Sequence, residues 1–245
     1  MSSDWESLRD VLHAYGYTFY EEKFMKRRID VCMRMENAGS YDAYRQLFSA
    51  QEQVRQRFAK EMAIHVTEFF RDPTVWQSLQ EKVIPLLPQH VHVWSAGCSY
   101  GLELISFAIL LKEAGKQFTI LGTDIDEPTL QKARSGIYED LSGISPSYTK
   151  YFVGNKVGAD ILSCVTYQKH DLLADAFPTQ QFDIIFCRNT VIYFTRTFKE
   201  QLYVQFFKNL KPQGFFVLGK TEILLGDARQ SFALFDVTNH IFRKE

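Results

Sequence analysis

Two glycines and two acidic residues are spaced like the ligand-binding edge of an open α/β sheet. Gly97 and Gly101 lie in the turn SAGCSYG (95–101), which follows an apolar run. Glu103 comes two residues after the second glycine, and Asp124 ends the next apolar run. Open α/β sheets bind ligands at the carboxyl ends of their strands. A glycine turn with carboxylates at that edge predicts a ligand with cationic groups and hydroxyls.

The glycine spacing argues against a dinucleotide. A dinucleotide turn, G-x-G-x-x-G, lets bare backbone approach the pyrophosphate, and here Ser99 stands at the second glycine position. The turn also lacks the lysine of a P-loop. S-adenosylmethionine carries no phosphate: backbone amides near Gly97 can face its methionine end, and Glu103 can take its cationic group. Asp124 is suited to the two ribose hydroxyls, because a carboxylate matches a vicinal diol.

Each of these residues also has a purely structural interpretation. Gly97 and Gly101 can serve turn geometry alone. Glu103 can complement a helix dipole, which is worth about 0.3–1 kcal/mol, and Asp124 can cap a helix. Taken together, at this spacing and in this order, the four residues favour a nucleoside cofactor.

The composition is that of an ordinary globular protein. A net charge of −1 provides no overall field to attract nucleic acid or an anionic membrane. None of the four cysteines forms a CxxC pair or stands at zinc-ligand spacing from a histidine, so we expect neither a metal site nor a disulfide framework. The first residues, MSSDWESLRD, do not resemble a signal peptide, and no apolar run approaches the roughly 18 residues of a membrane span. We therefore expect a cytoplasmic protein with no membrane insertion.

The first part of the chain is predicted to be helical. Apolar residues recur at helical spacing, which predicts helices over residues 5–17, 21–37, 41–48 and 51–64. Ser40 is placed to cap the third of these. We assign residues 1–70 to an N-terminal all-α domain, whose helices end near residue 64, and the start of a linker. Asp72 before Pro73 predicts the capped start of a further helix.

From residue 71 to 245, predicted strands and helices alternate, which is typical of a doubly wound, mostly parallel sheet of the α/β class. Residues 233–244 resemble a closing hairpin. Residues 139–170 fit the alternation poorly, so we expect a short inserted β-subdomain there. The predicted strands are 90–96, 118–126, 182–189 and 215–220, and the predicted helices are 102–115, 127–136 and 195–214.

Five segments in a fixed order resemble the CheR-type chemotaxis methyltransferases. They are HVTEFFRD (65–72), WSAGCSYGLE (94–103), GTDIDEPTLQKARSGIY (122–138), FDIIFCRNTVIYF (182–194) and LKPQGFFVLGKTE (210–222). The resemblance covers nearly the whole chain. It implies a class I, Rossmann-like, S-adenosylmethionine-dependent methyltransferase that acts on glutamates of a chemoreceptor and releases S-adenosylhomocysteine. It also suggests a monomer.

The resemblance extends to individual site residues. Tyr193 matches a tyrosine at the transfer site, and Arg71 is both a cofactor contact and a candidate catalytic residue. His65 stands where the family typically has Asn, and its charge near pH 6.5 would make binding pH-dependent if it faces the cofactor. The predicted cofactor-binding residues are His65, Thr67, Arg71, Gly97, Glu103, Asp124, Asp171, Leu172, Arg188 and Asn189.

Methyl transfer to a carboxylate needs orientation more than proton transfer. A glutamate with a pKa near 4.3 is already ionised at pH 7, so no general base is required. Arg71 can orient the carboxylate, since its guanidinium binds two oxygens, and Tyr193 can steer by hydrogen bonding. Structural alternatives remain: Arg71 can pair with Asp72 or another acid, and Tyr193 can belong to the core.

The substrate and partner are open at this point. Lys23, Arg27 and Arg34 fall roughly on one helical face, which is either a solvated face or a dock for acidic receptor helices. The same residues favour nucleic acid less, because the chain is nearly neutral. The family's polar run after the glycine turn is here GLELI (101–105). Two alternatives to a receptor methyltransferase are a non-catalytic module that binds S-adenosylmethionine or its product, and an enzyme acting on a small carboxylic acid.

Overall fold

The computed structural model describes residues 2–63 and 67–245. The chain divides into two compact units, one of residues 1–64 with 193–198 and the other of residues 65–192 with 199–245. The short segment 193–198 therefore clusters with the N-terminal helices, although it lies far from them in sequence. The hydrophobic pattern gave no indication of this.

The first unit is built from four helices, α1 (Ser2–Ala14), α2 (Glu22–Met35), α3 (Tyr41–Ala50) and α4 (Glu52–Met62). They bury a largely aromatic core that includes Tyr44, Phe48 and Phe58. Ser40 caps α3, because its side-chain oxygen accepts a hydrogen bond from the Ala43 amide at 3.2 Å. The four predicted helices and this cap are confirmed.

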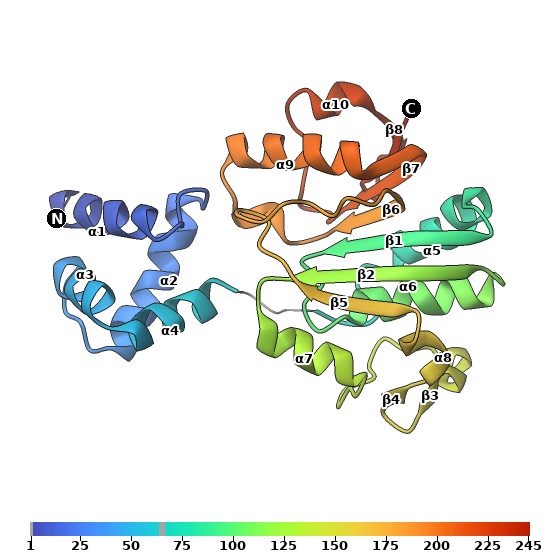
Figure 1. Ribbon diagram of the computed structural model, residues 1–245, viewed down its shortest axis with the longest axis horizontal. Coiled ribbons are helices and arrows are strands. Elements are labelled where there is room, and N and C mark those ends of the chain that lie inside the picture. Colours follow the sequence, from blue (N-terminus) through green and yellow to red (C-terminus); the bar gives the residue numbers. More distant parts are fainter. Residues whose placement is uncertain (1, 64–66) are drawn as a thin grey trace. The chain divides into compact units, whose positions relative to one another are not determined.

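The second unit contains a seven-stranded sheet in the order β5-β2-β1-β6-β7-β9-β8 (Figure 1). The first five strands in that order run parallel, and β9 pairs antiparallel with both β7 and β8. This confirms the predicted mostly parallel sheet and its closing hairpin. The strands are β1 (His90–Ala96), β2 (Gln117–Asp124), β5 (Val165–Lys169), β6 (Phe182–Cys187), β7 (Leu210–Leu218), β8 (Phe232–Asp236) and β9 (Ile241–Lys244).

Helices pack on both faces of the sheet, because side chains alternate between the faces along each strand. On one face, Phe186 of β6 contacts Trp76 and Phe107, with ring centroids 6.2 and 4.9 Å away. On the other face, Trp94 of β1 contacts Phe206 at 5.2 Å. The doubly wound class is therefore confirmed. The helices are α5 (Pro73–Ser78), α6 (Leu102–Glu113), α7 (Glu127–Ser135), α9 (Arg196–Asn209) and α10 (Ala228–Ser231); π-helical (Leu79–Val83) and 3-10 (Ile84–Leu86) turns extend α5.

One predicted helix is shorter than expected. The helix predicted over 195–214 ends at Asn209, and β7 begins at the next residue. The Lys244 ammonium donates hydrogen bonds to the carbonyls of Phe207 and Leu210, at 2.8 and 2.7 Å. These bonds satisfy carbonyls at the helix end, so the chain turns into a strand before it reaches Pro212.

The predicted insertion is also smaller than expected at its carboxyl end. Between α7 and β5 the chain forms a 3-10 helix (Pro146–Tyr151), a hairpin of β3 (Phe152–Val153) and β4 (Lys156–Val157), and α8 (Ala159–Leu162). Residues 165–169, which the prediction placed in the insertion, instead pair with β2 as an edge strand of the main sheet. The sequence hides this because Tyr167 is the one buried side chain of β5, so the segment lacks the apolar run that marked the central strands.

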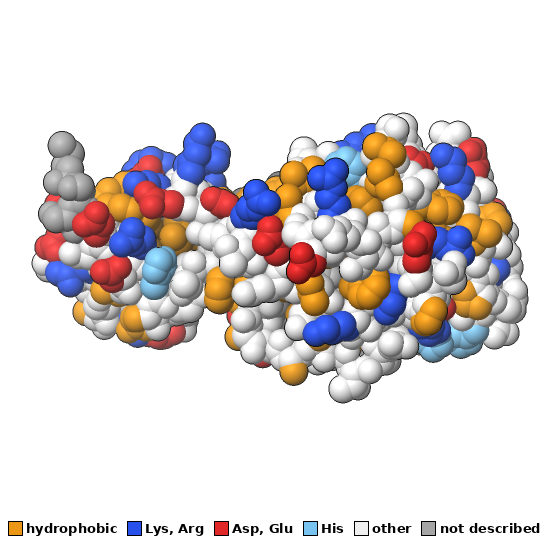
Figure 2. All heavy atoms as spheres, turned by 90° about the horizontal axis from the view of Figure 1, so that it is seen from above, with side chains coloured by type: hydrophobic (Ala, Val, Ile, Leu, Met, Phe, Trp, Pro, Cys, Tyr) orange, Lys and Arg blue, Asp and Glu red, His pale blue; other side chains and the backbone are white. Residues whose placement is uncertain are grey.

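Basic and acidic side chains are interspersed on the face of the molecule drawn in Figure 2, without a broad area of one sign. Within the described residues, none of the helices is long and apolar enough to cross a membrane.

Candidate active site

The parallel strands bring most of the predicted site residues to one edge of the sheet. Because β5, β2, β1 and β6 are parallel neighbours, their carboxyl ends lie side by side. Asp171, Asp124, Gly97 and Arg188 stand at or just after those four ends. Residues spread over 90 positions of sequence thus form one row, at the edge where open α/β sheets bind ligands.

The glycine turn after β1 is held by its own backbone. Gly97 has φ +78°, and a Cβ built on it would overlap the side chain of Thr190. The amides of Gly97 and Cys98 both donate to the carbonyl of Thr123, at 2.8 Å. We expected these amides to face a ligand. That expectation is wrong for these two N–H groups, because the end of β2 already uses them.

Asp124 is a buried carboxylate with fixed orientation. It is 8% exposed, and its two oxygens accept the amides of Ser99 at 2.8 Å and Asp126 at 3.1 Å. The residue that caps α7 is Asp126, whose side chain accepts from the Thr129 amide, so the capping alternative for Asp124 is wrong. Each carboxylate oxygen has a second lone pair, which leaves Asp124 able to accept hydrogen bonds from a diol.

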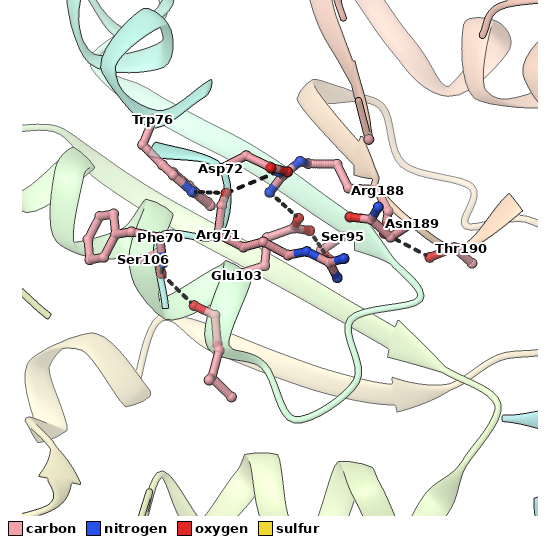
Figure 3. Close-up of polar contacts among 12 residues, drawn as sticks. Phe70, Arg71, Asp72, Trp76, Ser95, Glu103, Ser106, Arg188, Asn189 and Thr190 are labelled. Carbon is pink, nitrogen blue, oxygen red and sulfur yellow. Dashed lines mark hydrogen bonds and ion pairs between the residues drawn. The ribbon is translucent and has the colours of Figure 1, made fainter. Parts of the chain in front are cut away.

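Glu103 lies in the first turn of α6 between a hydroxyl and a guanidinium. Its oxygens accept from Ser95 Oγ at 2.9 Å and from Arg188 Nη1 at 3.3 Å. Burial raises the pKa of Glu103 above its ordinary value, while the charges of Arg188 and Arg71 and the Ser95 hydrogen bond oppose that shift. Figure 3 shows the side chains of both arginines directed toward this carboxylate. A cationic ligand group at Glu103 would meet an acid already oriented by its neighbours.

Arg188 is the centre of a buried charge cluster. Its side chain is 2% exposed. Nη2 donates to the Asp72 carboxylate at 2.7 Å and to the Arg71 carbonyl at 3.1 Å, and the guanidinium lies 5.6 Å from the centre of the Trp76 ring (Figure 3). Its Nε is buried and makes no hydrogen bond to the described part of the chain. Arg188 thus joins two carboxylates, Asp72 before α5 and Glu103 in α6, that lie 31 positions apart in sequence.

Asp72 does not cap α5, as the sequence predicted. The residue adopts φ +61°, and its side chain makes no capping hydrogen bond. Its carboxylate is drawn away to Arg188, since a buried guanidinium needs an acid more than an exposed helix start needs a cap. The predicted start of the helix at Pro73 is confirmed.

Arg71 sits between two residues in the left-handed region, Phe70 at φ +53° and Asp72 at φ +61°. Its carbonyl accepts a hydrogen bond from Trp76 Nε1 at 2.7 Å. Non-glycine residues with positive φ are uncommon and cluster at functional sites. The half-exposed Arg71 side chain therefore extends from a backbone whose conformation other parts of the unit must maintain.

Glu222 is a buried acid beside the site that the sequence analysis missed. It is 3% exposed, and its two oxygens accept the amides of Asn189 at 2.7 Å, Val191 at 2.9 Å and Gly219 at 2.7 Å. Burial raises its pKa, and these amide bonds oppose that shift. Glu222 thereby ties the loop after β6, including Asn189 at φ +58°, to the loop after β7. The available signal was a lone acid three residues past Gly219, the glycine of the segment FFVLGK.

The remaining predicted residues are less informative. Thr67, Asp171 and Leu172 are half-buried, and Asp171 accepts the Leu173 amide at 2.8 Å. His65 lies outside the described residues. Tyr193 belongs to the helical unit, where its ring centroid lies 4.4 Å from that of Phe24, and its role at the transfer site stays a prediction.

The fold and this site define a class I S-adenosylmethionine-dependent methyltransferase. A profile described as "CheR methyltransferase, SAM binding domain" matches residues 65–241. The chain belongs to the CheR methyltransferase family, and S-adenosylmethionine is its cofactor. The residues at this edge fit that cofactor: Glu103 would accept its amine, Asp124 would accept its ribose hydroxyls, and the glycine turn has no P-loop lysine to bind a phosphate.

Curated relatives support the same family. A chemotaxis protein methyltransferase of Listeria innocua is 30% identical over 229 residues, which cover 88% of this chain and 87% of that protein. Proteins of the same description from Borreliella burgdorferi and Vibrio cholerae are 31% and 30% identical, over 69% and 67% of this chain and 68% and 67% of theirs.

Proposed function

We propose that this chain methylates glutamate side chains of a chemoreceptor-like protein. When bound, S-adenosylmethionine supplies an electrophilic methyl group on a sulfonium, so a carboxylate oxygen forms the new C–O bond as the C–S bond breaks. Glu103 and Asp124 bind and orient the cofactor. Arg71 binds the acceptor carboxylate, and Tyr193 steers it by hydrogen bonding.

The observation that carries this proposal is the loop around Arg71. Two left-handed residues flank the arginine, and the ion pair of Asp72 with the buried Arg188 fixes the loop's end. An acceptor carboxylate is ionised at pH 7 and needs only to be held in line, and positioning of reactants can supply up to about 7–11 kcal/mol. A planar guanidinium with two parallel donors suits that task.

The altered run after the glycine turn does not favour a module that only binds, because it leaves the candidate site unchanged. Leu104 and Ile105, which replace polar or aromatic residues of the family, are 1% and 0% exposed and belong to the hydrophobic core. The change is thus absorbed by packing on the buried side of α6. Glu103, on the other side, keeps its contacts with Ser95 and Arg188.

The test is methyl transfer from labelled S-adenosylmethionine to cytoplasmic fragments of chemoreceptors. We expect base-labile label on the receptor, and a loss of roughly 10- to 100-fold in kcat/KM for Arg71→Ala, as for a lost charged hydrogen bond. Arg71→Lys keeps the charge without the two-pronged geometry and should recover only part of the rate. Label on small carboxylic acids alone would contradict the receptor substrate. Cofactor binding without any turnover would support the alternative of a non-catalytic module that binds S-adenosylmethionine or its product.

The basic residues of α2 support an acidic docking partner. Lys23, Arg27 and Arg34 are exposed, and the first two lie one helical turn apart. Replacing Lys23 and Arg27 together by glutamate should raise KM for the receptor and leave kcat unchanged. Lys60→Glu, on the exposed surface of α4, is the matched control. Equal effects of the two changes would contradict docking at α2.

A further inference from the structure

The insertion between α7 and β5 packs on the two phenylalanines that precede Arg71. The ring of Phe70 stacks on Tyr148, with centroids 5.4 Å apart and planes 26° apart. The ring of Phe69 makes edge contacts with Phe152 at 5.9 Å and with Tyr138 at 5.1 Å. These contacts join the insertion to the loop that carries a proposed catalytic residue.

The backbones of the insertion and the loop also meet directly. Gly143 has φ +85°, and a Cβ built on it would overlap the carbonyl oxygen of Phe69. Any side chain at position 143 therefore displaces either the insertion or the Phe69 peptide. Gly154, at the tip of the β3–β4 hairpin, has φ +63° and nothing within 4 Å of its Cβ position. Both glycines have positive φ, but only at Gly143 would a Cβ meet another part of the chain.

The loop needs such external support. Phe70 at φ +53° is in a conformation that a bulky residue rarely adopts. Its amide donates to Ser106 Oγ at 3.0 Å, and its ring lies 5.5 Å from Trp76 (Figure 3). Tyr148 supplies the stacked face of the ring. Without it, the contacts from α5 and α6 alone would have to keep Phe70 left-handed.

We propose that the insertion positions Arg71, with Gly143 and Tyr148 as positioning residues that act through Phe69 and Phe70. In this role the insertion supports the loop that carries Arg71. The inference rests on the proposed role of Arg71 in methyl transfer.

The first test compares Gly143→Ala with Gly154→Ala. Both place a Cβ at positive φ and should lower thermal stability, and Gly143→Ala should lower it further because its Cβ overlaps the Phe69 carbonyl oxygen, so activity is compared at a temperature at which both variants are folded. Gly143→Ala alone should weaken S-adenosylhomocysteine binding and lower kcat/KM for the receptor fragment, by roughly tenfold or more, since small misplacements of positioned groups are costly. Equal activity of the two variants would overturn the proposal.

The second test concerns the stacked ring. Tyr148→Ala should lower kcat/KM by roughly 2- to 12-fold, the range expected for one lost aromatic pair. Tyr148→Phe keeps the ring and should restore the unmodified rate. Failure of the phenylalanine variant to restore it would show that stacking on Phe70 is not what matters.

A double-mutant cycle separates positioning from general stability. In the Arg71→Ala background, Gly143→Ala should cause little further loss of kcat/KM, because both changes remove the same interaction. Independent, multiplying losses would overturn positioning through Arg71. An unmodified protein that binds S-adenosylhomocysteine but methylates no receptor would instead contradict the proposed function. The binding comparison between the two glycine variants would still test the inference.

Discussion

The two halves of the carboxyl edge are stabilised in different ways. Around β1 and β2, the backbone amides of the glycine turn donate to Thr123 and Asp124, and the left-handed positions of this turn are Gly97, Ser99 and Gly101. Around α5 and β6, left-handed positions fall on Phe70, Asp72 and Asn189. Buried charges hold the loops of that second half in place. The cofactor half is thus held by backbone hydrogen bonds between the ends of two adjacent strands, and the half that would receive the acceptor is held by charged pairs up to 116 positions apart in sequence.

This difference predicts where substitutions will be costly. The glycine turn, which backbone hydrogen bonds hold, should be sensitive to added side-chain volume and tolerant of a lost charge. The loops around Arg188 should be sensitive to a lost charge, since removing one partner of an ion pair leaves the other charge buried and unpaired.

Arg188→Ala should have the largest effect on stability. It leaves the carboxylates of Asp72 and Glu103 without their shared guanidinium, so we expect the free energy of unfolding to fall by about 3–5 kcal/mol. Urea denaturation measures this. Combining it with Asp72→Asn should recover part of the loss, because one unpaired charge is then removed. A loss below about 1 kcal/mol would show that the ion pairs of Arg188 do not stabilise these loops.

Glu222→Gln should lower the free energy of unfolding by less, about 1–3 kcal/mol. The side-chain NH2 of glutamine replaces one carboxylate oxygen, so a backbone N–H that donated to that oxygen loses its acceptor. The exposed Glu139→Gln is the control. We also expect weaker binding of S-adenosylhomocysteine, since the loop that carries Asn189 loses its anchor. Stability and binding equal to those of the control would contradict the role given to Glu222.

On the turn side, Gly97→Ala should cost more than Gly115→Ala. Both residues have positive φ, at +78° and +66°, and a Cβ at position 115 meets nothing within 4 Å. The control should lose about 1–2 kcal/mol for the left-handed conformation alone. Gly97→Ala should lose more because of its clash with Thr190. Equal losses would mean that Thr190 yields easily and that the turn is not limited by volume.

The smallest expected effect is a pH dependence from Glu103. Burial raises its pKa above 4.5, so the folded protein binds a proton more tightly than the unfolded chain. The stability from this group is complete below the unfolded pKa and is lost as the pH rises through the folded pKa. The unmodified protein should therefore lose stability relative to Glu103→Gln as the pH is raised from about 4.5 toward neutrality. Urea denaturation at several pH values measures this, and parallel curves would show that the Arg188 and Arg71 charges cancel the effect of burial.

The same contrast explains how much could be predicted from the sequence. The alternation of elements, the glycine turn, Glu103 and Asp124 are local patterns, and they predicted the sheet and its ligand edge. The pairing of Asp72 with Arg188 spans 116 positions, and Glu222 binds backbone amides, which carry no side-chain signal. Asp72 before Pro73 is a good local cap, and the prediction was wrong because a buried charge elsewhere competes for the carboxylate.

The account depends most directly on cofactor binding at this edge, through Glu103 and Asp124. Isothermal titration with S-adenosylhomocysteine, on protein checked for carried-over ligand, tests it. We predict micromolar binding to the unmodified protein. Asp124→Asn, which keeps one acceptor oxygen, should bind roughly tenfold more weakly or worse, as for a lost charged hydrogen bond. Equal binding by the variant, or no binding by the folded unmodified protein, would contradict the site.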